Sequence, residues 1–125
     1  MTNASVGTVY LLVAGLVFLL GFVILREAPR ERTNRATALM LFFAGFGSGL
    51  GAIGFILEGV GAAERGVNDL LRSFNYLWEL FFPSLLFFAC VFPQENRFYR
   101  RIPFGSSLIF APHVFHLLFM VLLSQ

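Results

Sequence analysis

The sequence predicts an all-α integral membrane protein in which four transmembrane helices form one antiparallel bundle, a single domain over residues 1–125. Hydrophobic residues make up 58% of the chain and charged residues 13%, whereas soluble domains are nearer half apolar and a quarter charged. The apolar residues gather into four long runs, and most of the arginines lie in two of the segments between them. So much apolar surface indicates that the chain is surrounded by lipid.

The first apolar run covers about residues 6–25 and contains no charge. At about 1.5 Å per residue, a helix of this length spans about 30 Å, the thickness of the hydrocarbon core. The preceding residues Met1–Ser5 lack a positive charge, and Arg26 follows the run directly. These flanks favour a retained span over a cleaved signal peptide.

The other three runs cover about residues 36–58, 73–93 and 102–124. They are apolar on all sides, whereas a barrel strand would alternate in polarity. Because lipid offers no hydrogen bonds to the backbone, we expect helices, and the short connections make successive helices antiparallel neighbours. Pro83 and Pro112 lie inside the third and fourth runs and predict kinks there.

The arginines predict the orientation in the membrane. Seven of the nine arginines lie in the first and third connections: Arg26, Arg30, Arg32 and Arg35 in the first, and Arg97, Arg100 and Arg101 in the third. The other two, Arg65 and Arg72, lie in the second connection. Positively charged connections stay in the cytoplasm, so both termini should lie outside the bacterial cytoplasmic (inner) membrane. The lipid bilayer is then the main partner, and a net charge of +2 gives no indication of nucleic-acid binding.

Glycines crowd the second run in two GxxxG pairs, Gly45 with Gly49 and Gly47 with Gly51. Small residues at this spacing let helix backbones approach closely in a membrane. We therefore predict close helix packing here, either against another span or against a second copy of the chain.

Five residues are candidates for ligand binding or sensing: Glu58, Trp78, Glu79, His113 and His116. Glu58 closes the second run and Glu79 follows Trp78 near the start of the third, so both carboxylates should lie near the outer surface. A carboxylate in a span is costly and marks a functional site or a pairing partner. For Glu58 we favour simple contact of the carboxylate with water or with an arginine such as Arg65 or Arg72. For Glu79 two interpretations stay open, a functional site and a carboxylate that is merely paired.

His113 and His116 are three residues apart and share one helix face. Such a pair can bind a metal or relay protons, but hydrogen bonding between helices is the favoured reading. Cys90 is the single cysteine, so it has no partner for a disulfide or a cysteine metal site. We expect no metal, no cofactor and no catalytic residue, because the sequence contains no nucleophile–base set and no phosphate loop.

The third run ends in Leu85-Leu86-Phe87-Phe88-Ala89-Cys90-Val91-Phe92-Pro93, followed by Arg97, Arg100, Arg101 and a new run containing Ala111-Pro112. Phe88–Pro93 fits an F-x-x-x-F-P span end. Over about residues 36–115 this pattern resembles the seven-transmembrane N-terminal region of bacterial histidine kinases and related signalling proteins. The resemblance implies three further spans and a cytoplasmic effector domain, which would make this chain a fragment or an effector-less relative.

These features favour a non-catalytic membrane sensor or input module of a bacterial signal-transduction protein. Its expected partners are missing C-terminal signalling domains or a second copy of the chain. Two other readings stay open. One is a small structural or assembly membrane protein that packs through its glycine-rich helix, and the other is a transporter or proton-pathway subunit.

Overall fold

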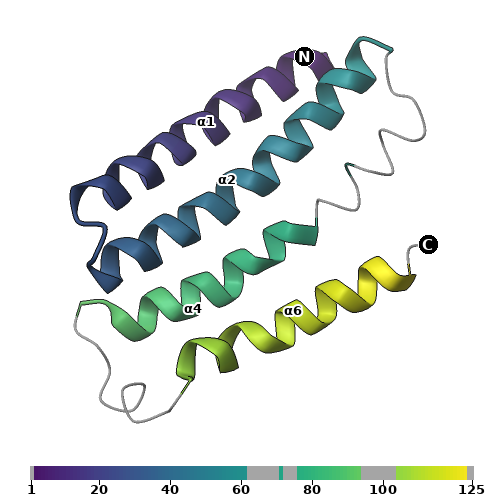
Figure 1. Cartoon of the computed structure of the whole chain (residues 1–125). Helices are drawn as coiled ribbons and strands as arrows, with labels where there is room; N and C mark the ends of the chain where they lie inside the picture. The colour runs from purple at the N-terminus through teal and green to yellow at the C-terminus, as the bar shows by residue number, and fades with distance from the viewer. Residues whose placement is uncertain (1, 62–70, 72–75, 94–103, 124–125) are drawn as a thin grey trace.

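The computed structural model describes residues 2–61, 71, 76–93 and 104–123 (Figure 1). The described part contains four α-helices and one short 3₁₀ helix: α1 (Asn3–Glu27), α2 (Arg32–Gly59), η1 (Tyr76–Leu80), α4 (Phe81–Val91) and α6 (Gly105–Leu123). The predictions of an all-α chain and of four helices are confirmed for these residues. The helices lie side by side in chain order, with α1 and α6 at the two edges (Figure 1).

Local hydrogen bonds define both ends of α1. At its start, the Thr2 hydroxyl accepts a hydrogen bond from the backbone N–H of Ser5 at 3.3 Å. Near its end, the Asn34 side-chain amide donates to the carbonyl of Ile24 at 3.0 Å. This bond satisfies a carbonyl of the last turn and ties α1 to the start of α2.

Helices α1 and α2 pack through small residues at seven-residue spacing. The buried residues of α1 are Gly7, Ala14 and Gly21, and those of α2 are Ala36, Ala38, Gly45 and Ala52. A side chain added at Gly7 would meet Ala52 and Ile56, and one added at Gly21 would meet Phe42. The two helices therefore run antiparallel in a constant register, and the heptad spacing is typical of coiled-coil-like packing.

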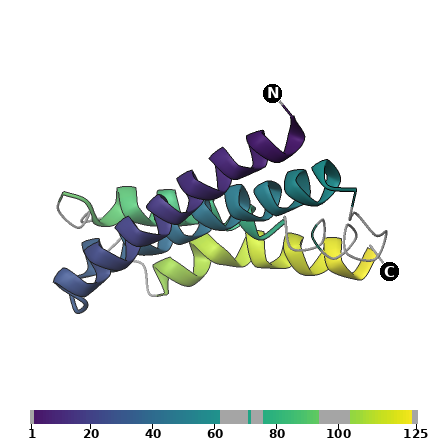
Figure 2. The same cartoon turned by 90° about the horizontal axis from the view of Figure 1, so that it is seen from above.

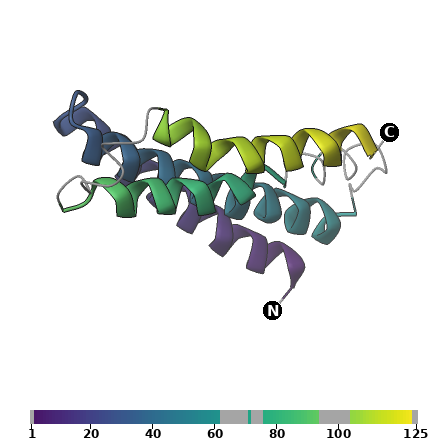
Figure 3. The same cartoon turned by 90° about the horizontal axis from the view of Figure 1, so that it is seen from below.

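The opposite side of α2 carries η1 and α4, and α6 packs on these two elements. Phe87 of α4 and Phe110 of α6 meet with ring centroids 6.4 Å apart. Views from above and below show α1 tilted across the other helices, with α2 between α6 and the N-terminal half of α1 (Figures 2 and 3). Helix α2 is thus the central element of the molecule.

The burial pattern is the reverse of that in a soluble protein. The buried hydrophobic side chains among the described residues are four alanines and Val91. Large apolar side chains instead point outward along the edge helices: Leu12 and Leu16 of α1 are each 66% exposed, and Phe115 and Leu122 of α6 are 73% and 74% exposed.

Two helices, α1 and α2, are long and apolar enough to cross a membrane, judged by length and composition, whereas Tyr76–Val91 and Gly105–Met120 are shorter apolar helices. The third predicted span differs most from the structure, because its described part begins with the 3₁₀ helix η1, and residues 73–75 lie outside the described part. Pro83 lies buried in the first turn of α4, where its missing N–H costs no helical hydrogen bond. Pro83 therefore starts a helix and does not kink one, and α6 continues unbroken through Pro112.

Candidate functional site

The structure brings together two of the five predicted site residues, Glu79 and His116. Nδ1 of His116 lies 2.8 Å from Oε2 of Glu79, although the residues are 37 positions apart. With Glu79 ionised, the ring N–H donates to the carboxylate, and the contact becomes an ion pair when the imidazole is protonated. This bond joins η1, at the start of the third helix, to the middle of α6.

The chain around Glu79 is held in place by its neighbours. Pro83 and Ser84 are the largest fully buried side chains described, and the Ser84 hydroxyl donates to the carbonyl of Leu80 at 2.6 Å. Pro83 lies in the first turn of α4, so the Glu79 carbonyl precedes the α-helix and receives no hydrogen bond from residue 83. The change from 3₁₀ to α-helix therefore occurs next to the carboxylate, at a buried and hydrogen-bonded junction.

Trp78 lies against the glycine-rich helix. A Cβ built on Gly47 would be 2.5 Å from the Cβ of Trp78, so only glycine permits this approach of η1 to α2. The indole also makes an edge contact with Phe82, with ring centroids 5.3 Å apart, and is 40% exposed. Gly47 and Trp78 together position η1, and thereby Glu79.

Glu58 and His113 lie apart from this pair. Glu58 is exposed in the last turn of α2, and His113 is half-buried in α6. Among the described residues, neither side chain forms a hydrogen bond or ion pair with Glu79 or His116. The suggested partners Arg65 and Arg72 of Glu58 lie outside the described residues. Among the described residues, no group of three histidine, cysteine, aspartate or glutamate side chains could hold a metal ion.

The four glycines singled out in the second run have three different surroundings. Gly45 and Gly49 face Phe18 and Ala14 of α1, whereas Gly47 faces η1. At Gly51 an added Cβ would meet no described atom within 4 Å, so close packing at Gly51 stays a prediction. The α1 half of this interface was missed, although its seven-residue spacing is visible in the sequence.

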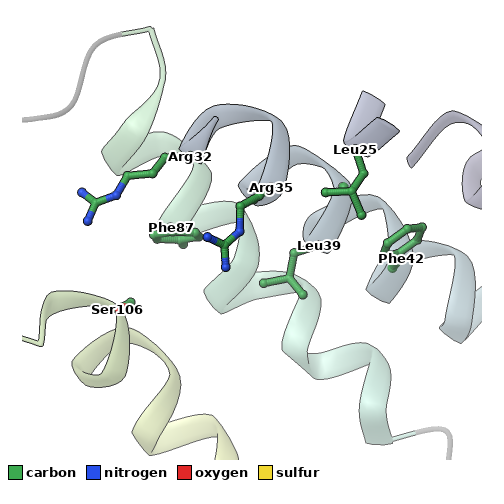
Figure 4. Close-up of a pocket in the computed structure, with 8 residues that line it drawn as sticks. Leu25, Arg32, Arg35, Leu39, Phe42, Phe87 and Ser106 are labelled. Atoms are coloured by element: carbon green, nitrogen blue, oxygen red, sulfur yellow. The ribbon is translucent and has the colours of Figure 1, made fainter. Parts of the chain in front are cut away.

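A cavity of about 410 Å³ lies at the other end of the molecule, where α1 joins α2 (Figure 4). Arg32, Arg35 and Ser106 contribute polar groups to its wall, and the remaining described lining residues are apolar: Leu25, Ala38, Leu39, Phe42 and Phe87. From the sequence, the two arginines predict only the orientation in the membrane. Their convergence with Ser106 depends on the packing of α2, α4 and α6, which no local pattern indicates.

Comparisons with protein-family models, with curated proteins and with solved structures found no match to this chain. The resemblance to membrane regions of bacterial signalling proteins therefore stays a prediction.

Proposed function

We propose that this chain is a non-catalytic sensor or input module of bacterial signal transduction, built as an antiparallel bundle that crosses the cytoplasmic membrane four times. The reversed burial supports the membrane location. In water, exposed Leu and Phe side chains such as Leu16 and Phe115 would form a large unfavourable apolar surface, whereas in lipid they are solvated. Close packing of glycine and alanine between helices is what membrane bundles use instead of a large-residue core.

The helix lengths are compatible with this arrangement. Helix α1, with 25 residues, extends about 37 Å, and α6, with 19 residues, extends about 29 Å. The five residues of η1 and eleven of α4 add up to about 27 Å, because a 3₁₀ helix rises about 2 Å per residue. A hydrocarbon core near 30 Å accommodates the shorter pair by local thinning.

The Glu79–His116 bond is the observation that carries the sensor proposal. A carboxylate in lipid is stabilised by a partner, and here that partner belongs to an edge helix. A stimulus that changes the charge of either group, or competes for the carboxylate, alters the contact between η1 and α6. Motion of α6 relative to α2 is then the output of the module.

Distance measurements between spin labels test this proposal. The labels are placed at Ile53→Cys on α2 and Leu118→Cys on α6, both exposed positions, in a Cys90→Ser background. In lipid nanodiscs, Glu79→Gln should shift or broaden the distance distribution. Glu58→Gln is the matched control, since it removes an exposed carboxylate outside the pair, and should leave the distribution unchanged. One identical distribution for all three proteins would indicate a rigid scaffold and refute the sensor proposal.

A second observation favours the assembly function as the alternative. An apolar hollow of about 390 Å³ lies along α1 and α2, lined by Leu11, Gly15, Phe18, Phe46, Leu50 and Ile53 among others. Such a surface suits the side chains of another membrane helix. If the spin-label distances do not respond to Glu79→Gln, cross-linking through Gly15→Cys would test whether a partner helix occupies this hollow. A proton-pathway subunit would instead show a proton leak in liposomes that Glu79→Gln abolishes.

A further inference from the structure

The cavity at the α1–α2 junction combines two kinds of wall. Arg35 points into the space between α2, α4 and α6, toward Phe87, while Arg32 extends away from it along the end of the bundle (Figure 4). Ser106 reaches the same cavity from the first turn of α6. None of the described lining residues is acidic, so the fixed charge of the described wall is positive.

The polar groups suit a phosphate. A guanidinium presents a planar fork of N–H donors that matches two phosphate oxygens, and a serine hydroxyl adds a further donor. The cavity lies beside the first turns of α2 and α6, and the N-terminus of a helix carries partial positive charge from its unpaired backbone N–H groups. Glu27 and Glu31 belong to the neighbouring turn, but their side chains do not line the cavity.

The remaining wall suits a hydrocarbon chain. Leu25, Leu39, Phe42 and Phe87 line the cavity beside the arginines, and its volume of about 410 Å³ exceeds the space that one phosphate group needs. A ligand that fills the whole site thus has an anionic head and an apolar tail.

We propose that this cavity is a phosphate-binding site in which Arg35 holds the anion, Ser106 adds a hydroxyl donor, and the apolar wall receives an attached chain. The phosphate belongs either to an anionic phospholipid of the inner leaflet or to a soluble phosphate compound. This proposal goes beyond the sensor function and stands independently of the Glu79–His116 bond, which lies at the other end of the molecule.

Native mass spectrometry of the whole chain in detergent tests the site. The probes are dioleoyl phosphatidylglycerol, the zwitterionic dioleoyl phosphatidylcholine, and inorganic phosphate. Arg35→Gln should weaken phosphatidylglycerol binding about tenfold, because it removes the bidentate charge-assisted contact. Arg30→Gln is the matched control: it removes the same charge from the exposed turn, which does not line the cavity, and should change binding less than about twofold.

Two further variants protect the test against a folding defect in Arg35→Gln. Ser106→Phe fills the cavity from α6 and leaves both arginines in place, so it should weaken binding comparably. Arg35→Lys keeps the charge but loses the fork, and should give an intermediate affinity.

Binding of phosphatidylglycerol without binding of inorganic phosphate would support the site and identify a lipid as its ligand. Binding of inorganic phosphate that is lost in Arg35→Gln would support the site with a soluble ligand. Equal weakening by Arg30→Gln and Arg35→Gln would show general charge attraction and overturn the proposal, as would retention of phosphatidylcholine and phosphatidylglycerol to the same extent by every variant.

Discussion

Glu79 and His116 form a hydrogen bond between two ionisable side chains, at the end of the described part of the molecule opposite the cavity. Its partners are unequally exposed, with 26% of the Glu79 side chain and 53% of the His116 side chain accessible. Polar contacts between membrane helices contribute about 0.6 kcal/mol on average and at most about 1.7 kcal/mol. A bond of this strength can be broken by a change in protonation or by a competing ligand, as a sensor requires.

A double-mutant cycle measures this bond. We expect Glu79→Ala and His116→Ala each to lower the free energy of unfolding in detergent, and the double variant to lose less than the sum of the two. The coupling energy should be about 0.6 kcal/mol. Strict additivity of the two losses would show that the residues do not interact. Glu58→Ala combined with His116→Ala provides the non-contacting pair that should be additive.

Gly47 is a second single residue on which the site depends. Gly47→Ala places a Cβ 2.5 Å from that of Trp78, close to the backbone of η1, so the contact cannot relax by a side-chain rotation alone. We expect a loss of about 1–3 kcal/mol in the free energy of unfolding and a shift in the emission of Trp78, the single tryptophan. Gly51→Ala, four residues along the same helix, meets no described atom and should be neutral or slightly stabilising. Equal effects of the two substitutions would contradict this account of η1 packing.

At the scale of the helices, α1 and α2 form the best-defined unit. Their interface repeats small residues every seven positions on both helices, and the pairs Ala4–Gly59 and Gly7–Ile56 lie in the same register as Ala14–Gly49. The third element differs, because Pro83 and the buried Ser84 divide it into η1 and α4. The candidate site thus lies on an irregular element that rests against a regular helix pair.

The α1–α2 interface makes a prediction that two glycines of one helix can test. Gly7→Ala would place a Cβ 2.8 Å from the Ala52 carbonyl oxygen, so we expect it to push the helices apart and lower the melting temperature in detergent. Gly15→Ala meets nothing within 4 Å among the described residues and should raise the melting temperature slightly, since alanine favours the helix more than glycine does. A higher stability for Gly7→Ala than for Gly15→Ala would show that the register is wrong.

At the scale of the whole molecule, the two ends differ in charge and in chemistry. The end that holds the cavity contains Arg32 and Arg35, whereas the other half holds the Glu79–His116 bond. The arginine distribution along the chain places the first end in the cytoplasm under our proposal. A stimulus from outside would then act on the carboxylate, and a ligand of the inner leaflet would act on the arginines.

Reporter fusions check this orientation. A reporter that is active only in the cytoplasm should work when fused after Arg30 or Arg100 and fail after Asn68 or Gln125, because seven of the nine arginines lie in the first and third connections. Activity at both Arg30 and Gln125 would require an odd number of spans, which contradicts the four-span assignment. Activity at Asn68 without activity at Arg30 would reverse the orientation.

The all-α class, the number of helices and the approximate bounds of α1, α2 and α6 follow from composition and run length, because these properties depend on local sequence alone. Glu79 and His116 were recognised as candidates for a similar reason, since polar groups in apolar runs are costly wherever they lie. Their pairing could not be derived, because a distance between residues 37 positions apart depends on how α4 and α6 pack.

Tertiary packing also decided which of the small residues of α2 contact another helix. The sequence marks Gly47 and Gly51 alike, but one lies against Trp78 and the other meets no described atom, because only one face of α2 points toward η1. In the same way, Arg35 and Ser106 are far apart in the chain and share a cavity only because α2 and α6 both reach the α1–α2 junction. Local apolar patterning determines which elements form, whereas the rotation and register of each helix determine which side chains meet.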